Sequence, residues 1–362
     1  MQPTIRNIGV LTSGGDAPGL NAVIRSVVKT AIIQYGWDVF GIVDGFEGLV
    51  GEPRIKPLTL DSVSGLLPRG GSVLGCTNRG HFKMDPAGPN LIATFQQAAE
   101  TIARLELDAI VMVGGDGSHR IARELIRLGV PLVGVPKTID NDLAGTDSTF
   151  GFDTAVSFAT EAIDRLHTTA ESHGRVMVVE VMGRDAGWIA LYAGIAGGAD
   201  VILIPEIPYV LEKAAVKINA RIQAGKRFSI VVTAEGALPC GCANGALGGR
   251  TGAPHRNVSV AHDVANALQE MTDREARAVV LGHLQRGGSP TASDRVLATS
   301  YGAAAVKAVA DGQMGHMVAW KGGRIVLVPI GDDVSTARLV PTDHPLIATA
   351  RGLGITFAGV TD

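Results

Sequence analysis

Residues 109–118 read AIVMVGGDGS, and this stretch decides the fold of the chain. Five apolar residues lead into two glycines, an aspartate, a glycine and a serine, and residues 119–128 then repeat apolar positions with helical spacing. A buried strand, a glycine-rich turn and a helix in this order are typical of a parallel α/β unit. Glycine lets the backbone approach a ligand closely, and the free amides at the start of the helix face an anion. The stretch therefore predicts a phosphate-binding loop at the end of a strand.

The same order of strand, turn and helix occurs near the amino terminus. Residues 8–11 are apolar, residues 12–19 read TSGGDAPG, and residues 20–33 have helical periodicity. Further apolar runs predict strands at 131–135, 176–181, 201–204, 229–234 and 278–281, with helical stretches between most of them. Because such alternation builds mostly parallel sheets with helices on both faces, we expect ligands beyond the carboxyl ends of these strands.

Length and composition narrow the class of protein. The chain has 362 residues, which suits two domains of ordinary size, and its 46% hydrophobic content with 47 glycines indicates compact α/β packing. A net charge of -3 argues against a nucleic-acid-binding protein, which would need a basic surface. We see neither a signal peptide nor an apolar run of membrane-spanning length, so we expect a cytoplasmic enzyme. Residues 236–254, rich in glycine and alanine, predict a flexible surface loop.

The first loop also carries a carboxylate. Asp116 lies where a phosphate is expected, so a cation such as magnesium is needed between the two charges. The glycines alone also suit a plain structural turn, because the third glycine of the dinucleotide fingerprint is out of register and the Walker lysine is missing. Asp16 in the earlier turn suits a metal less well, since it can cap the next helix. The aspartate is what favours a nucleotide or polyphosphate site.

A second loop, residues 136–142, reads PKTIDND and follows the apolar run at 131–135. Asp140 and Asp142 offer two carboxylates, and Thr138 offers a hydroxyl, which suffice for a general base and positioning groups around one reacting oxygen. A solvated acidic turn is the alternative for this loop taken alone. Beside a metal-type aspartate, it predicts phosphoryl transfer.

Cationic residues stand beside the ends of the later predicted strands, in otherwise apolar surroundings. They are Arg175, Arg184, Arg277, His283 and Arg286. Several such residues together suggest recognition of a phosphate on the substrate, whereas one alone would be an ordinary surface charge. Glu235 follows the run at 229–234 and is either an acceptor for sugar hydroxyls or a surface glutamate at the start of a loop.

The chain resembles the 6-phosphofructokinases of the bacterial type from residue 8 to about residue 301. Five motifs in family order carry the resemblance: GGDAPG at 14–19, GGDGS at 114–118, TIDND at 138–142, MGR at 182–184 and GHLQRGGSP at 282–290. The resemblance implies two Rossmann-like three-layer domains with mostly parallel sheets. It implies a nucleotide-binding domain of residues 1–151 plus about 285–335. A sugar-phosphate domain would comprise residues 152–284 plus about 336–362.

The resemblance also implies roles. Asp140 would be the base that deprotonates the 1-hydroxyl of fructose 6-phosphate, and Asp116 would sit with magnesium. Thr138, Asp142 and Arg184 would surround the transferring phosphoryl group. The sugar phosphate would be held by Met182, Gly183, Glu235, His283 and Arg286, and by Arg175 and Arg277 of a neighbouring subunit in a homotetramer or homodimer. The donor would contact Gly15, Asn78, Arg79, Gly115, Gly117, Ser118 and Lys137.

Two of these residues disagree about the donor. Gly117 resembles the nucleotide-dependent enzymes, in which the missing side chain leaves room for the inner phosphate of ATP. Lys137 is similar to the lysine of diphosphate-dependent enzymes. We expect ATP, because an aspartate at position 117 would crowd and repel that phosphate, whereas a lysine is compatible with either donor. The chain is most similar to a hybrid subgroup of ATP users, with diphosphate as the alternative donor.

Regulation and two other functions stay open. Arg25, Arg54, Glu206 and Lys226 resemble part of the family's effector site, so we expect an allosteric enzyme with a changed effector. Another kinase class also carries a Gly-Gly-Asp-Gly loop, but lacks the motifs at 138–142 and 282–290. A sugar-phosphate sensor without activity would have lost the base or the metal residue, and Asp116 and Asp140 are both present.

Overall fold

A computed structural model describes residues 5–77, 80–82, 91–241, 259–331, 334 and 336–360 of the chain, and all structural statements concern these residues. The chain divides into two compact units. The first comprises Met1–Ile139, Leu143–Thr154 and Arg286–Ala337, and the second comprises Asp140–Asp142, Ala155–Gln285 and Arg338–Asp362. Each unit is thus built from three separate segments of sequence.

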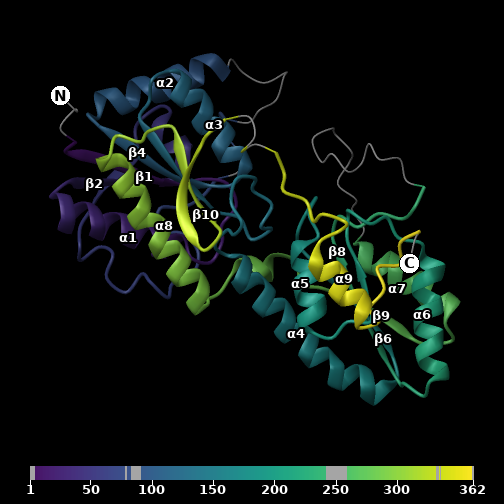
Figure 1. The fold of residues 1–362 in the computed structure, drawn as a ribbon. Coiled ribbons are helices and arrows are strands. Elements are labelled where there is room, and N and C mark those ends of the chain that lie inside the picture. Colours follow the sequence, from purple (N-terminus) through teal and green to yellow (C-terminus); the bar gives the residue numbers. More distant parts are fainter. Residues whose placement is uncertain are drawn as a thin grey trace. The chain divides into compact units, whose positions relative to one another are not determined.

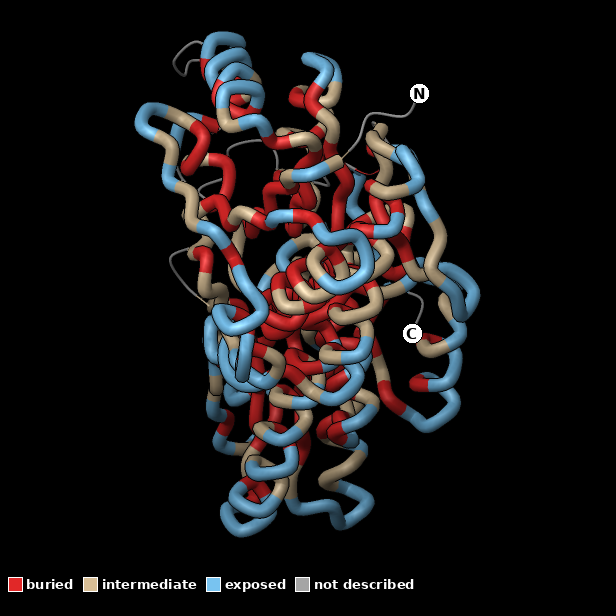
Figure 2. The backbone as a smooth tube through the Cα atoms, turned by 90° about the vertical axis from the view of Figure 1, so that its left-hand side faces the viewer, coloured by how far each residue is buried: buried red, intermediate tan, exposed pale blue. Residues whose placement is uncertain are grey.

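The first unit contains a seven-stranded sheet in the order β11-β10-β5-β4-β1-β2-β3 (Figure 1). Its strands are β1 (Asn7–Thr12), β2 (Asp38–Ile42), β3 (Ile55–Leu58), β4 (Ala109–Gly114), β5 (Leu132–Pro136), β10 (His316–Lys321) and β11 (Arg324–Pro329). The central strands are parallel, and β3 and β11 run antiparallel at the two edges. Strands β4 and β5 are buried at every residue, which explains their uninterrupted apolar sequences. Figure 2 shows the buried residues of the chain in red.

Helices cover both faces of this sheet. On one face lie α1 (Leu20–Thr30) and α8 (Ala292–Ala310), and on the other lie α2 (Leu91–Arg104) and α3 (Asp116–Arg127) (Figure 1). Each face forms its own apolar core with the strands beneath it. A π-helical turn, Ala31–Tyr35, continues α1, and a short 3-10 helix, Gly45–Leu49, follows β2.

The second unit contains a parallel four-stranded sheet in the order β7-β8-β6-β9. The strands are β6 (Val176–Val181), β7 (Val201–Leu203), β8 (Ser229–Ala234) and β9 (Ala276–Val280). Helices α6 (Leu211–Gln223) and α7 (Val260–Met271) share an apolar core with one face, and α5 (Trp188–Ala196) packs on the other. The remaining helices are α4 (Phe152–His173), α9 (Pro345–Gly352), which contacts α5, and the 3-10 turn Gly282–Arg286.

The predicted fold class, two α/β units with mostly parallel sheets, is confirmed. All seven strands predicted from apolar runs are present, and β2, β3, β10 and β11 were not predicted. Strands β10 and β11 form a hairpin around Gly322 and Gly323, whose φ angles of 55° and 83° suit a tight turn that matches the strand twist. The pair of glycines is a signal that could have revealed this hairpin.

Two expectations concern features outside the sheets. The loop expected at 236–254 lies mostly outside the described residues. In the part of the chain that the structure describes, no helix is long and apolar enough to cross a membrane.

Candidate active site

In the first unit, three loops meet at one edge of the sheet. Strands β1, β4 and β5 are parallel neighbours, with Thr12 opposite Val113 and Gly114 opposite Pro136, so their carboxyl ends lie together. The sheet order places β2 beside β1 and β5 beside β4, on opposite sides of the β1–β4 pair. Parallel α/β sheets bind their ligands at such a switch point.

The loop after β4 forms the amino terminus of α3. Gly115 is the N-cap residue and Asp116 is the first residue of the helix, so the amides of the first turn have no partner within the helix. A Cβ on Gly114 would lie 2.3 Å from Cβ of Ser118, so glycine is what lets this buried serine pack against the turn. The arrangement is an anion site of the kind that phosphates occupy.

His119 fixes this turn from below. Its side chain is fully buried, and its Nδ1 lies 2.8 Å from the carbonyl oxygen of Gly115. Burial lowers the pKa of His119 to about 4, so the ring is neutral near pH 7. Because a carbonyl only accepts hydrogen bonds, Nδ1 carries the proton and donates it. The histidine was not predicted, although its spacing of four residues from Gly115 on a helix is a usable signal.

Lys137 joins the loop after β5 to the loop after β1. Its side chain is 3% exposed, and its Nζ donates to the carbonyl oxygen of Gly15. Its backbone nitrogen donates to the carbonyl oxygen of Gly114 at 2.9 Å. A positive charge is thus held among the glycine-rich loops, where it would attract a phosphate.

The side chain of Arg286 also packs against the loop after β1. Its Nη1 donates to the carbonyl oxygen of Asp16 at 3.1 Å, and a Cβ on Gly15 would come within 2.8 Å of that nitrogen. Gly15 therefore gives the guanidinium room against the loop. The resemblance assigns Arg286 to the sugar phosphate, and the structure brings it together with Gly15 in the first unit.

Gly117 behaves differently from the other glycines of these loops. It lies in the first turn of α3, its φ is not in the left-handed region, and the nearest protein atom to a Cβ built on it is 3.9 Å away. A side chain would therefore fit without strain, and glycine lowers the stability of a helix relative to alanine. Neither the backbone nor the packing of the described residues requires a glycine here.

Asp116 is the predicted metal ligand. Its Oδ2 lies 3.0 Å from Nη2 of Arg120, one helical turn further on, and about a third of its side chain is exposed. Among the described residues, no three His, Cys, Asp or Glu side chains gather as a metal site. One accessible carboxylate fits magnesium that is held mainly by donor phosphates and water, as this ion commonly is.

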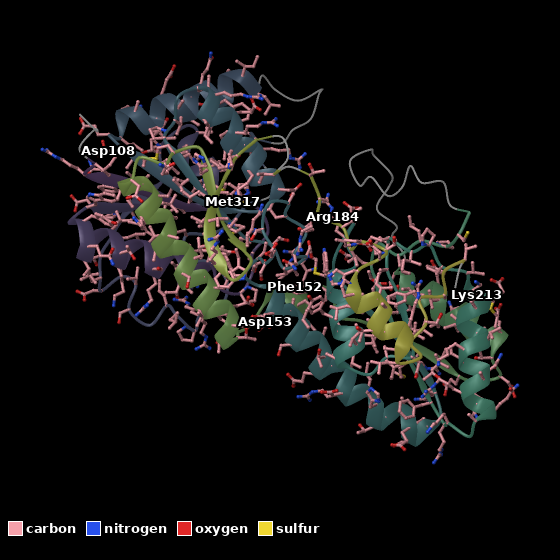
Figure 3. The ribbon with its side chains drawn as sticks, in the orientation of Figure 1. Asp108, Phe152, Asp153, Arg184, Lys213 and Met317 are labelled. Carbon is pink, nitrogen blue, oxygen red and sulfur yellow. The ribbon has the colours of Figure 1, made fainter. Side chains whose placement is uncertain are left out.

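In the second unit, the predicted acceptor residues also follow parallel strands. Val181 of β6 pairs with Ala234 of β8, and the loops after them carry Arg184 and Glu235. The backbone nitrogen of Arg184, labelled in Figure 3, donates to Oε1 of Glu235 at 3.0 Å. The structure therefore joins two residues that lie 51 positions apart in the sequence.

The turn that carries Arg184 has an unusual backbone. Gly183 has a φ of 141°, and a Cβ there would lie 2.4 Å from the carbonyl oxygen of Ala186. Arg184 itself has a φ of 50°, which a non-glycine residue rarely adopts. Such conformations gather at ligand sites. Met182 is buried, so its side chain belongs to the core and its backbone borders the turn.

The loop with the predicted base is tightly held. Asp140 and Asn141 are buried, and Asn141 has a φ of 52°. Arg338 donates to the carbonyl oxygen of Asn141 from Nε at 3.2 Å and from Nη2 at 2.9 Å. Its backbone nitrogen donates to the carbonyl oxygen of Asp142 at 2.6 Å. Sequence reasoning missed Arg338, because its partners lie almost 200 residues earlier in the chain.

Thr138 belongs to the first unit. Its carbonyl oxygen accepts a hydrogen bond from Oγ1 of Thr149 at 2.7 Å. His283 lies in the 3-10 turn Gly282–Arg286, which follows β9 in the second unit. Asn78 and Arg79, the expected adenine-side residues, lie outside the described residues.

Arg175 and Arg277 lie at the amino ends of strands in the second sheet, whereas Arg184 and Glu235 follow the carboxyl ends. Arg175 immediately precedes β6 and Arg277 is the second residue of β9, so both are at the amino ends of these strands. The six residues of β6 separate Arg175 from Met182, which is roughly 20 Å at the usual rise of a strand. Arg277 pairs with Met177, the second residue of β6, so within one unit both arginines lie far from the residues that follow the strands.

Glu275 connects these two arginines. Its Oε2 lies 2.5 Å from Nε of Arg175, and its Oε1 accepts a hydrogen bond from Nη2 of Arg277. The hydrogen bond from Arg175 and the two positive charges hold the pKa of the Glu275 carboxyl below its usual range. Glu275 was not among the predicted site residues.

Comparison with known proteins identifies the class that this fold and these loops define. The family model described as phosphofructokinase matches residues 7–309. The chain belongs to the phosphofructokinase family.

Relatives of known name agree over nearly the whole chain. An ATP-dependent 6-phosphofructokinase of Chloroflexus aurantiacus is 55% identical over 97% of this chain and 98% of its own length. One of Spirochaeta thermophila is 48% identical over 98% of each chain. The T-state phosphofructokinase of Pichia pastoris has a TM-score of 0.80 and 33% identity, covering 92% of this chain and 36% of that longer chain. A pyrophosphate-dependent phosphofructokinase of Marinobacter aquaeolei, at 24% identity over 93% of this chain and 86% of its own, shares the fold with a TM-score of 0.76.

Proposed function

We propose that this chain transfers the terminal phosphoryl group of ATP to the 1-hydroxyl of fructose 6-phosphate. The products are fructose 1,6-bisphosphate and ADP, and the reaction is a step of glycolysis. Membership of the phosphofructokinase family and the names of its ATP-dependent relatives support the reaction. For the donor, the observation that carries most weight is Gly117, because nothing in the described fold requires a glycine there. The space that a side chain at position 117 would fill is then explained as room for the inner phosphate of ATP.

The donor is assigned to the first unit, whose loops supply the anion site at α3. Backbone amides near Gly115 and Ser118 would bind phosphate oxygens, and Lys137 would offset their charge. Magnesium, when bound, would neutralise charge between the donor phosphates, with Asp116 as its protein ligand. Asn78 and Arg79 are proposed on the adenine side from the resemblance alone.

Most of the residues proposed for the acceptor belong to the second unit, and Thr138 and Arg286 belong to the first. Asp140 would take the proton of the 1-hydroxyl while the hydroxyl oxygen forms a bond to the terminal phosphorus of ATP. The bond between that phosphorus and the oxygen that bridges it to ADP would break. The leaving oxygen departs with ADP. Thr138, Asp142 and Arg184 would orient and stabilise the transferring group. The sugar phosphate would be bound by Met182, Gly183, Glu235, His283 and Arg286.

Two of these assignments would change the use of contacts already described. Glu235 accepts from the backbone of Arg184, so a substrate hydroxyl would use the remaining acceptor capacity of this carboxylate. Arg286 would exchange its bond to the carbonyl oxygen of Asp16 for the sugar phosphate.

Arg175 and Arg277 are proposed to act on the substrate of a neighbouring subunit. Their place at the amino ends of β6 and β9 supports this, because residues at opposite ends of the strands of one sheet cannot surround one ligand. The assembly would then be a homodimer or homotetramer with shared active sites.

We also propose a cytoplasmic location, since both substrates are charged metabolites. We further propose regulation by a phosphate-bearing effector.

The donor is tested by measuring rates with ATP, ADP and diphosphate at a fixed concentration of fructose 6-phosphate. Turnover with ATP at least about tenfold faster than with the other two, a difference of about 1.4 kcal/mol in activation free energy, is expected. Diphosphate is the second candidate, because the buried Lys137 would suit a compact, highly charged donor. Turnover of another alcohol, with none of fructose 6-phosphate, would instead identify a different kinase.

A further inference from the structure

The last part of the second unit, residues 338–360, is called the C-terminal segment below. Its far end is fastened to the rest of the unit. Lys213 of α6, labelled in Figure 3, donates from Nζ to the carbonyl oxygens of Gly359 at 2.8 Å and Val360 at 2.6 Å. Thr356 forms a parallel bridge with Val201 at the edge of the sheet. The segment is therefore an ordered part of the unit.

Its near end is held by the first residue of α5. The guanidinium carbon of Arg338 lies 4.4 Å from the ring centroid of Trp188, and Nε1 of Trp188 donates to the carbonyl oxygen of Arg338 at 2.8 Å. Trp188 is 3% exposed, so it offers a rigid surface. The ring fixes the plane of the guanidinium, and the hydrogen bond fixes the backbone of the same residue.

Glu206 fastens the segment two residues further on. Its Oε1 accepts from the backbone nitrogen of Val340 at 2.8 Å and from that of Gly187 at 3.0 Å. Gly187 directly precedes Trp188, so the carboxylate fixes the backbone on both sides of the contact between Trp188 and Arg338. The position of Arg338 is thus determined by several bonds at once.

From this position, Arg338 holds two successive carbonyl groups of the loop that contains Asp140. The guanidinium donates twice to the carbonyl oxygen of Asn141, and the backbone nitrogen donates to that of Asp142. Fixing two neighbouring carbonyls fixes the peptide planes between them. It thereby holds Asn141 in its left-handed conformation, which non-glycine residues adopt only uncommonly.

We propose that Arg338 is a positioning residue for phosphoryl transfer. It acts through the backbone of Asn141 and Asp142 and keeps the carboxylate of Asp140 in line with the hydroxyl that loses its proton. The inference rests on the proposed function, since it takes Asp140 as the base. A planar fork is needed for this role, because a lysine ammonium on the same stem can neither donate in parallel to one carbonyl nor stack flat on Trp188.

The test compares wild-type protein with Arg338→Gln, Arg338→Lys and the control Arg351→Gln. Arg351 belongs to the same segment, and its guanidinium lies over Phe357 at 5.6 Å, so its removal matches the loss of charge and of a ring contact. In Arg338→Gln, kcat should fall about 10- to 100-fold while the KM values for both substrates change less than about threefold, since a misplaced base slows chemistry rather than binding. Arg338→Lys should be intermediate, and the control should match the wild type.

Hydrogen exchange of the peptide covering residues 138–144 provides a readout that needs no substrate. Loss of the charged hydrogen bonds should speed exchange at 140–142 at least about tenfold in Arg338→Gln, and not in Arg351→Gln. Equal exchange and equal kcat in Arg338→Gln and wild type would overturn the proposal. A fall in kcat that follows only the folded fraction, with faster exchange throughout the C-terminal segment, would also overturn it in favour of a structural role.

The two levels of inference fail in different ways. Wild-type protein that does not phosphorylate fructose 6-phosphate would refute the proposed function, and the exchange comparison would still decide whether Arg338 holds the loop. If Arg338→Gln does not fold, Arg338→Lys retains the charge beside Trp188 and supplies the same two measurements.

Discussion

The donor loops of the first unit and the acceptor loops of the second are held in different ways. At the donor side, the contacts within the turn that begins α3 are local, since His119 and Arg120 each bond to a residue four positions away, whereas Lys137 and Arg286 reach the loop after β1 from 122 and 270 positions away. At the acceptor side, Arg184 depends on Glu235, 51 positions away, and Asn141 depends on Arg338, 197 positions away. The turn that begins α3 is encoded in one strand, turn and helix. The arrangement at the acceptor side exists only when distant segments have folded together.

The largest expected effect tests the acceptor side. Asp140→Asn keeps the shape of the buried side chain and removes the base, so kcat should fall about 10²- to 10⁴-fold. Calorimetric titration should still detect binding of fructose 6-phosphate. Turnover equal to that of the wild type would remove Asp140 from the mechanism.

The donor side is tested by Gly117→Asp. Since the protein leaves space for the side chain, the fold should be retained, and an acidic residue in the first turn suits a helix. Repulsion of the donor phosphates should lower kcat/KM for ATP by about 10²-fold or more.

Gly352→Asp is the control for this change, because a Cβ on Gly352, at the end of α9, would have no protein atom within 4 Å and a side chain there would fit equally well. It should leave kcat/KM for ATP unaltered. If Gly117→Asp also retained full use of ATP, the space at Gly117 would need another explanation.

Sharing of the acceptor site between subunits predicts complementation. Arg277→Ala alone should raise KM for fructose 6-phosphate about 10- to 100-fold, as expected for loss of a charged hydrogen bond to a phosphate. Mixed oligomers of Arg277→Ala and Asp140→Asn subunits should recover about a quarter of wild-type activity, because half of random dimers carry one intact site. Mixtures no more active than the separate variants would argue that each subunit has its own complete site.

The smallest effect concerns the stability of the donor turn. The imidazole of His119 has a pKa of about 4 in the folded chain, against an ordinary value of 6.5 for a histidine in water. The unfolded chain therefore binds a proton first, and the free energy of unfolding should fall by about 3 kcal/mol as the pH drops from 6.5 to 4.

His119→Asn keeps a donor toward the carbonyl oxygen of Gly115 and removes this titration. The free energy of unfolding of both proteins is measured with urea between pH 7 and pH 4. The difference between the two values should become smaller as the pH falls. A difference that stays constant would show that His119 titrates alike in both states. Comparing the two proteins also cancels the opposite contribution of Glu206, whose pKa is raised by burial.

The same contrast explains what could be predicted from sequence. The strand at 109–113 and the loop with Asp116 were recognisable because an apolar run, glycines and a helix start are local signals. Strand β2 and the edge strand β3 were missed, since they are short and only partly buried, so their apolar pattern is weak. Arg338 could not have been found, because nothing in its own neighbourhood indicates a partner at position 141. Glu275 was overlooked, because its two partners, Arg175 and Arg277, were expected to bind substrate rather than a carboxylate of the same chain.

The contact between Arg338 and Asn141 also has a consequence for the order of events during synthesis. The ribosome adds Arg338 197 residues after Asn141, which takes roughly 10 to 40 s at ordinary rates of elongation. During that time, the emerging chain comes to contain the whole region that matches the family, residues 7–309, but not the arginine that holds its proposed catalytic loop. Catalytic competence would thus arrive only once Arg338 has been added, after both sheets have been made.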